Sequence, residues 1–200
     1  MNYSQLIQQL NQGNLAQVYL ILGDQEYLAG RIKDAFVKII PDNERSMNIG
    51  NYDMEDTTIS AAVEDAISVP FFGERRLVMI NRPYFLTGMR TKSKLDQNID
   101  DFLEYLKHPE ESTVMVIFAP YDKLDSRKKV TKALKKVATT IEIGSLRENE
   151  IKKLVTDKIA AAGFKIDHDA LDRMVELTGG KLTAMMSDLP KLILYNNESH

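Results

Sequence analysis

The segment Ser112–Phe118, with the sequence STVMVIF, carries the strongest indication of the fold. It is an apolar run without polar alternation, which is typical of a strand buried on both faces of a sheet. Weaker β-like runs lie before and after it, and helical patterns separate them. Because strands and helices alternate, the sequence predicts an α/β fold with a mostly parallel sheet flanked by helices. The expected strands are 17–22, 46–53, 76–81, 112–118 and 139–144, and the expected helices are 25–40, 57–68, 96–107 and 126–138.

The pattern changes after Gly144, where apolar residues recur at helical spacing. Ser145–Glu148 reads SLRE, which is the signature of a capping box at the start of a helix. The following apolar residues mark three short helices, and Pro190 should kink or split the third. We therefore expect two domains, an α/β domain over residues 1–144 and a small three-helix lid domain over residues 145–200.

The composition argues against several classes of chemistry. The 200 residues include no cysteine, which removes disulfides, thiolate metal sites and thiol nucleophiles. His108, His168 and His200 are far apart in the sequence, which argues against a histidine metal centre or a histidine-based triad. No apolar run is long enough to span a membrane, and the N-terminus lacks signal-peptide features. We expect a cytoplasmic protein without a metal or a membrane partner, and the net charge of −3 does not indicate nucleic-acid binding.

An α/β domain followed by a small helical domain suggests a nucleotide-driven ATPase, so the phosphate-binding loop must be tested separately. Such a loop needs a glycine-rich turn after the first strand, then lysine and a hydroxyl residue. Gly23 is present, but Leu28 replaces the second loop glycine. Ala29 and Gly30 follow where lysine and serine or threonine belong, and Asp122 comes too late after its strand to hold a metal ion. The sequence argues against ATP hydrolysis and predicts no cofactor. The alternative function is a nucleotide-binding AAA+-type ATPase with an unconventional phosphate loop.

The predicted helix 126–138 has one apolar and one basic side. The apolar stripe has helical spacing and should face the core. The basic side could hold DNA phosphates through charge alone. The absence of interleaved aromatic residues favours a solvated helix surface, so a DNA-binding adaptor stays an alternative function. The stripe consists of Val130, Ala133, Leu134 and Val137, and the candidate phosphate contacts are Lys128, Lys132, Lys135 and Lys136.

The segment SVPFFGERRLVMI, residues 68–80, places two phenylalanines between two residues that interrupt regular structure. Pro70 lacks an N–H donor and Gly73 favours a turn, so the pair should lie at a corner. Bulk statistics favour burial of Phe71 and Phe72. The neighbouring elements favour exposure, because the preceding helix already has an inward stripe and charged residues follow the pair. An apolar corner rimmed by charge is typical of an anchor that fills a pocket on another protein. The stripe consists of Ile59, Ala62, Val63, Ala66 and Ile67, and the charged rim consists of Glu74, Arg75 and Arg76.

Four segments together resemble the delta subunit of the bacterial DNA polymerase III clamp loader. SVPFFGERRLVMI is the most specific, because that family carries two bulky apolar residues before a short charged turn. The other three mostly reflect the fold and read VYLILGDQEYL, STVMVIFAPYDKLDSRKK and TGGKLTAMMSDLPKLILY. The resemblance covers essentially the whole chain and implies an AAA+-like module without nucleotide chemistry.

The resemblance also implies a function: a non-catalytic subunit of the DNA polymerase holoenzyme, which binds and opens the sliding clamp for loading onto primed DNA. Phe71 and Phe72 would insert into a hydrophobic pocket of the clamp, and Val69 and Pro70 would shape the approach. The family often has leucine followed by phenylalanine, so Phe71 departs modestly from its pattern. Other clamp-loader subunits would be partners of the full-length protein, whose helical collar domain we expect to be absent from this chain.

Overall fold

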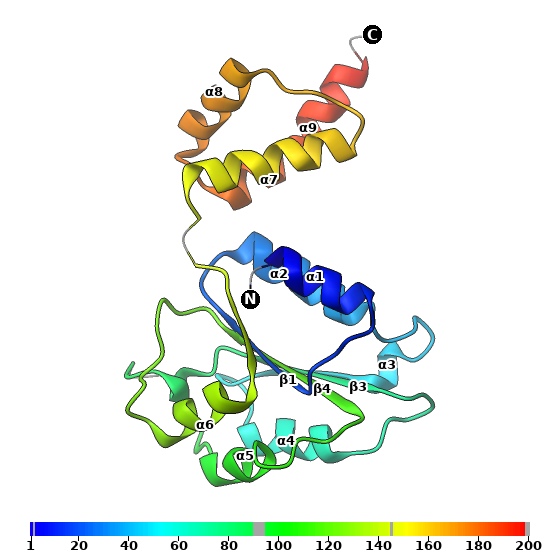
Figure 1. The fold of residues 1–200 in the computed structure, drawn as a ribbon, viewed down its shortest axis with the longest axis vertical. Helices are drawn as coiled ribbons and strands as arrows, with labels where there is room; N and C mark the ends of the chain where they lie inside the picture. The colour runs from blue at the N-terminus through cyan, green and yellow to red at the C-terminus, as the bar shows by residue number, and fades with distance from the viewer. Residues whose placement is uncertain (2, 90–94, 145, 199–200) are drawn as a thin grey trace. The chain divides into compact units, whose positions relative to one another are not determined.

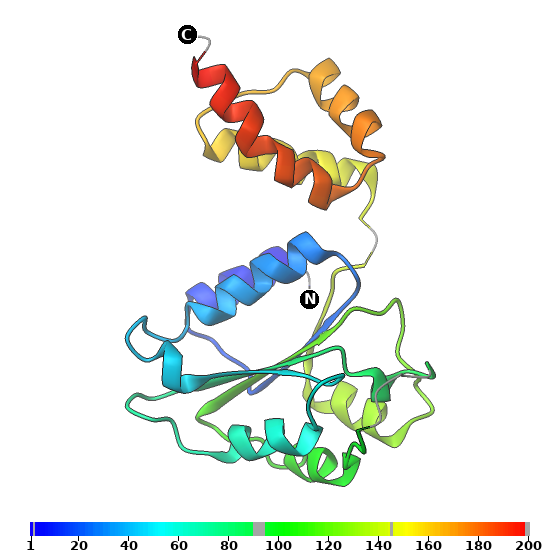
Figure 2. The same cartoon turned by 180° about the vertical axis from the view of Figure 1, so that it is seen from behind.

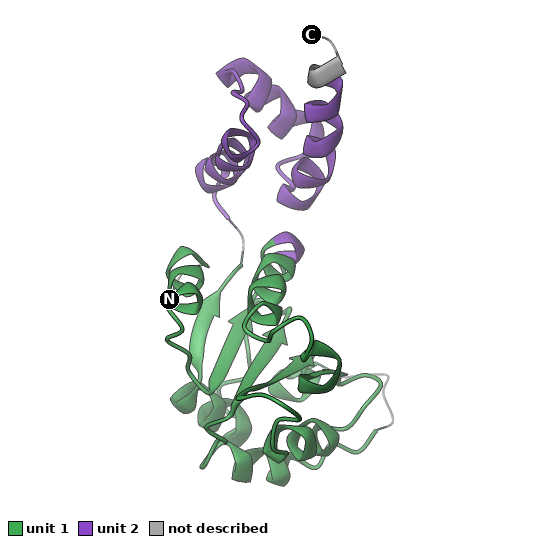
Figure 3. Cartoon of the chain, turned by 90° about the vertical axis from the view of Figure 1, so that its right-hand side faces the viewer, with its two compact units in different colours: residues 1–24, 28–144 green, residues 25–27, 145–200 purple. Residues whose placement is uncertain are grey.

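The computed structural model describes residues 1, 3–89, 95–144 and 146–198. The chain divides into two compact units, one of residues 1–24 and 28–144 and the other of residues 25–27 and 145–200 (Figure 3). The first unit combines a sheet with helices, and the second contains three helices.

A parallel five-stranded sheet, in the order β2-β3-β4-β1-β5, forms the centre of the first unit. β4 (Thr113–Ala119) is the central strand, and all of its residues are buried. The apolar run at 112–118 is therefore explained by burial on both faces, and the predicted α/β fold with a parallel sheet is confirmed. The other strands are β1 (Val18–Leu22), β2 (Ile49–Asp53), β3 (Arg76–Asn81) and β5 (Thr139–Glu142).

Helices cover both faces of the sheet (Figures 1 and 2). Alternate residues of each strand serve the two layers, because side chains along a strand point to opposite faces. Leu20 and Ile117 belong to the core cluster that includes residues of the helices on one face. On the other face, Tyr19 meets Phe36 edge to face, with the ring centroids 4.8 Å apart. One face carries α1 (Tyr3–Asn11) and α2 (Glu26–Val37), and the opposite face carries α4 (Ile59–Ile67), α5 (Ile99–Tyr105) and α6 (Lys129–Val137).

Two short helices interrupt the connections between these elements. η1 (Tyr84–Leu86) is a single 3-10 turn after β3. α3 (Arg45–Asn48) occupies most of the first half of the segment 46–53, which the sequence predicted to be a strand throughout. The backbone N–H groups of Met47 and Asn48 both donate to the carbonyl oxygen of Glu44, at 3.1 and 3.0 Å, which closes a helical turn instead. The strand prediction was therefore wrong for residues 46–48, and β2 begins at Ile49.

The second unit contains α7 (Glu148–Ala161), α8 (His168–Thr178) and α9 (Leu182–Glu198). The carboxylate of Glu150 accepts a hydrogen bond from the backbone N–H of Arg147 at 2.7 Å. The glutamate that caps α7 is therefore Glu150 rather than the predicted Glu148, and Ser145 lies outside the described residues. Pro190 lies inside α9, which continues through it as one helix, so of the two predicted effects, a kink or a split, the split is wrong.

Candidate protein-binding site

The two phenylalanines project from the loop between α4 and β3 into solvent. Phe71 is 51% exposed and Phe72 is 78% exposed, while Val69 before them is 83% exposed. The interpretation that both rings are buried in the core is therefore wrong. The rings pack against each other edge to face, with centroids 4.7 Å apart and planes at 78°. We call Val69, Phe71 and Phe72 the apolar tip, and Pro70 between them is half-buried.

Exposed apolar residues continue on either side of the tip. The sequence placed Ile67 in the inward stripe of its helix, but Ile67 is 55% exposed. It is the last residue of α4, and the chain turns to extended backbone at Ser68, so the helical stripe ends one residue earlier at Ala66. Met47 of α3 is also 55% exposed. Its position shows that a segment distant in the sequence adds apolar surface near the tip.

The tip lies at the amino edge of the sheet, next to α3 (Figure 1). β2 and β3 are parallel, and Ile49 pairs with Leu77. Asn48, which precedes β2, therefore lies beside the loop that enters β3. The Asn48 side chain is fully buried and makes three hydrogen bonds to the tip backbone. Its Nδ2 donates to the carbonyl oxygens of Phe71 and Phe72, at 2.9 and 3.1 Å, and its Oδ1 accepts from the N–H of Phe71 at 2.7 Å.

The turn after the rings has an uncommon backbone conformation. Phe72 has a φ of 51° and Gly73 a φ of 131°, both in the range that L side chains rarely adopt. A Cβ atom on Gly73 would also come within 2.1 Å of a carboxylate oxygen of Glu44. Because the Glu44 side chain can move aside, the positive φ is what requires glycine at position 73, as the predicted corner does.

An ion pair between Asp65 and Arg76 lies behind the tip, with side chains only 14% and 12% exposed. The Arg76 guanidinium also donates at 3.4 Å to the carbonyl oxygens of Met47 and Val69, which links α3 to the start of the tip. Arg76 was expected in the charged rim, and its largely buried side chain corrects that prediction.

Burial and the neighbouring Asp65 raise the pKa of Tyr52 to about 12.

The carboxyl edge of the sheet carries the positions that a phosphate-binding loop would occupy, directly after β1. Gly23 follows β1 with a φ of 130°, and a Cβ there would lie 2.5 Å from the backbone nitrogen of Gly144. Close packing on the end of β5 thus explains this glycine without a phosphate. Leu28 is buried, and a pocket of about 210 Å³ beside Gly23 also contains Ala29, Gly30 and Arg82 among its lining residues.

Two arginines at this edge are bound by carboxylates, while Lys33, which also lines the pocket beside Gly23, donates to the amide oxygen of Asn51 at 3.5 Å. Arg82 donates to the Asp53 carboxylate at 2.7 Å and pairs with Glu55, and the hydrogen bond with Asp53 raises the pKa of Arg82. A second cavity of about 780 Å³ is lined by the segment after β4. There Arg127 pairs with Asp125 at 2.9 Å and, through its hydrogen bonds, lowers the pKa of Asp125 to about 2.

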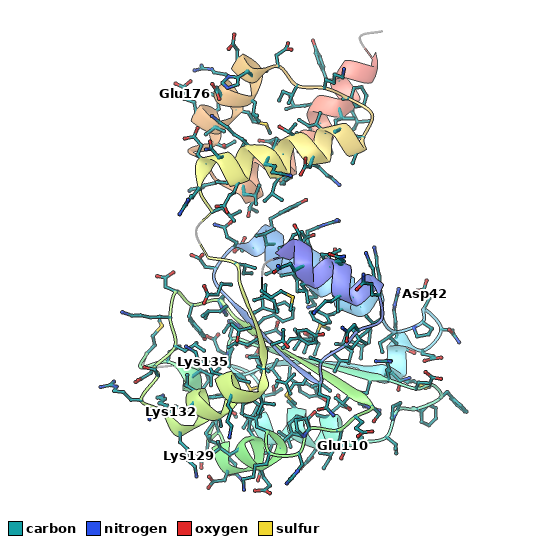
Figure 4. The ribbon with its side chains drawn as sticks, in the orientation of Figure 1. Asp42, Glu110, Lys129, Lys132, Lys135 and Glu176 are labelled. Atoms are coloured by element: carbon teal, nitrogen blue, oxygen red, sulfur yellow. The ribbon has the colours of Figure 1, made fainter. Side chains whose placement is uncertain are left out.

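The basic side of α6 is exposed, and Lys129, Lys132 and Lys135 project from it (Figure 4). Lys132, Lys135 and Lys136 form no ion pair with any of the described residues. Lys128 differs, because its Nζ donates to the carbonyl oxygen of Phe85 at 2.9 Å. In the apolar stripe Val137 is 40% exposed, so its predicted core position was wrong.

The described residues provide neither a metal-binding cluster nor a membrane-spanning helix. Within residues 1, 3–89, 95–144 and 146–198, no group of three or more histidine, aspartate or glutamate side chains could hold a metal ion. Over the same part of the chain, each helix is too short or too polar to cross a bilayer.

The architecture defines the class first, an AAA+-like module. Domain III of the replication initiation protein DnaA from Thermotoga maritima superposes with a TM-score of 0.51 at 13% identity, over 98% of this chain and 83% of that one, which shows the fold alone. The solved structure of the Bacillus subtilis DNA clamp loader delta protein superposes with a TM-score of 0.80 at 32% identity. That match covers 96% of this chain and 57% of the Bacillus chain.

The sequence comparisons then give the family. The family model described as DNA polymerase III, delta subunit, matches residues 19–144. The chain is 34% identical over 187 residues to DNA polymerase III subunit delta of Bacillus subtilis (strain 168), over 93% of this chain and 54% of that protein. It is 24% identical over 188 residues to a probable DNA polymerase III subunit delta of Aquifex aeolicus (strain VF5), over 91% of this chain and 51% of that protein. The chain belongs to the DNA polymerase III delta subunit family, and it spans about half the length of the curated relatives it matches.

Proposed function

We propose that this chain is the part of a clamp-loader delta subunit that binds the sliding clamp through the apolar tip. The observation that carries the proposal is the exposure of Phe71 and Phe72 on a loop whose backbone is hydrogen-bonded to the buried side chain of Asn48. Two adjacent exposed rings on a loop that is held in place are suited to fill a pocket on another protein. Aromatic side chains at the centre of an interface contribute much of the binding free energy. Val69 and Pro70 shape the approach to the rings.

The proposed mechanism is a shift in the equilibrium between closed and open clamp rings. A ligand shifts such an equilibrium only by the difference between its affinities for the two states. The tip therefore binds the open or strained ring more tightly than the closed ring, and no covalent bond changes. Sibling clamp-loader subunits in the cytoplasm would be further partners and would supply the energy of ATP.

We also propose that this chain does not hydrolyse ATP. Gly23 is explained by its contact with Gly144, and Arg82 is held by Asp53 and Glu55. The loop after β1 offers neither the lysine nor the hydroxyl residue that would neutralise phosphates and hold magnesium. Isothermal titration with ATP and magnesium tests this proposal, and clear binding would favour the rival ATPase interpretation.

The decisive experiment removes both rings at once. Phe71→Ala with Phe72→Ala should weaken binding to the cognate sliding clamp by about 2–4 kcal/mol, as truncation of a central hot spot does. Surface plasmon resonance measures the affinity, and circular dichroism checks the fold. The matched control is Leu177→Ala with Leu194→Ala, because both leucines are exposed apolar residues of the second unit. Equal affinities of the wild type and the Phe71/Phe72 variant would end the proposal.

DNA binding by α6 is a second candidate, and the exposed Lys132, Lys135 and Lys136 favour it. Lys128 is a weaker candidate than the sequence predicted, since its ammonium group is bound to Phe85. Contacts with phosphates release counterions, so binding should weaken steeply with salt. Replacing Lys132, Lys135 and Lys136 by glutamine should lower the affinity for primed DNA and flatten the salt dependence in a fluorescence anisotropy titration. An unchanged salt slope would reject this candidate.

A further inference from the structure

One fully buried side chain, that of Asn48, makes three hydrogen bonds to the backbone at Phe71 and Phe72. Asn48 directs both hydrogens of its amide nitrogen to carbonyl oxygens of Phe71 and Phe72, and its amide oxygen accepts from the N–H of Phe71. The amide of asparagine has two donor hydrogens and one acceptor oxygen. All of its donor capacity is thus directed to the tip, and the side chain is entirely shielded from solvent.

The backbone conformation of the tip is unfavourable in itself and needs a restraint from outside the two rings. Phe72 has a φ of 51°, in the left-handed region that is unfavourable for a bulky residue. Residues in such conformations persist only where their surroundings determine them, and they cluster at functional sites. The ring of Phe72 is mostly exposed and buries little apolar area in the free protein. The hydrogen bonds of Asn48 therefore supply the restraint at the two rings, while Arg76 binds the carbonyl oxygen of Val69 at the start of the tip.

We propose that Asn48 is a positioning residue that holds the tip in its partner-bound conformation before the partner arrives. This inference rests on the proposed function of the tip. Ordering a loop during association lowers affinity, and a loop that is already ordered avoids that loss. Asn48 acts through Phe71 and Phe72 and lies beneath them, where its buried amide cannot itself contact a partner.

A double-mutant cycle tests the inference in this chain. Asn48→Ala should weaken binding to the sliding clamp by at least about tenfold, because a tip without its restraint must be ordered during binding. In the Phe71→Ala, Phe72→Ala background, the same change should weaken the residual binding by less than about twofold, since no rings remain to be positioned. Thr131→Val is the matched control, because Thr131 is fully buried and donates to the carbonyl oxygen of Leu86 on the far side of the first unit. It should leave the affinity unchanged.

Hydrogen exchange separates positioning from general stability. In Asn48→Ala the amide of Phe71 should exchange faster, while amides of β4 keep their protection. If this variant does not fold, Asn48→Ser replaces it, because an uncharged hydroxyl can donate to at most one of the two carbonyl oxygens. Wild-type affinity in a folded Asn48 variant would overturn the inference and leave the proposed function intact. Wild-type affinity in the Phe71/Phe72 variant would overturn the proposed function itself.

Discussion

Asp65 in the last turn of α4 and Arg76 at the start of β3 form an ion pair, and both side chains are largely buried. The pair joins the two elements between which the chain makes its exposed excursion through the apolar tip. The Arg76 guanidinium extends the connection to the carbonyl oxygens of Val69 and Met47. A loop that projects large apolar side chains is therefore closed at its base by opposite charges.

Breaking this pair on one side should destabilise the fold. Asp65→Ala leaves the Arg76 charge without its partner, and we expect the free energy of unfolding to fall by about 3 kcal/mol. Urea unfolding followed by circular dichroism measures the change. Combining Asp65→Leu with Arg76→Met should recover most of the loss, because no unpaired buried charge remains. A double variant as unstable as the single one would contradict this account.

Ile67 should matter for binding and not for stability. Because it is exposed, Ile67→Ala should change the free energy of unfolding by less than about 0.5 kcal/mol, while weakening clamp binding by about 1 kcal/mol. Val63, one helical turn earlier and 8% exposed, provides the contrast. Val63→Ala should cost about 2 kcal/mol of stability with little effect on the affinity of the folded protein. Thermal unfolding measures the stability of both variants, and surface plasmon resonance measures their affinity for the clamp. A larger loss of stability in Ile67→Ala than in Val63→Ala would contradict the prediction.

Gly23 and Gly30 should respond in opposite directions to alanine. Gly23→Ala places a Cβ against the backbone of Gly144 at a positive φ, and we expect a loss of about 2 kcal/mol. Gly30 lies in the interior of α2 with nothing within 4 Å of an added Cβ. Gly30→Ala should therefore stabilise the protein by about 0.5–1 kcal/mol through its higher helix propensity. Denaturant midpoints compare the two, and a stabilising Gly23→Ala would refute the packing explanation.

Pro190 should limit the stability of the second unit. It lies inside α9, where proline lacks the N–H donor and crowds the preceding turn. Pro190 is exposed, so Pro190→Ala removes no core contact and should stabilise this helix by up to about 3 kcal/mol. Thermal unfolding monitored at 222 nm measures the gain. A lower melting temperature in the alanine variant would show that the proline has another structural role.

The sequence by itself determined the α/β class, the parallel sheet and the place of the apolar tip, because these depend on local pattern. An apolar run at 114–118 without polar alternation is typical of burial on both faces, and Pro70 and Gly73 favour a turn between them. The family resemblance rests on the same local segments, and the family model confirms it.

Only the tertiary structure decided how the tip is held and which residues surround it. Asn48 is a plain polar residue in the sequence, and its three bonds to the tip follow from the pairing of β2 with β3, which no local pattern encodes. Ile67 and Val137 keep the helical spacing of core residues, yet they lie at helix ends where the packing has stopped. The physical reason is the same in each case. Hydrogen bonds and burial between segments distant in the sequence depend on which segments the fold brings together, and local sequence patterns do not specify that.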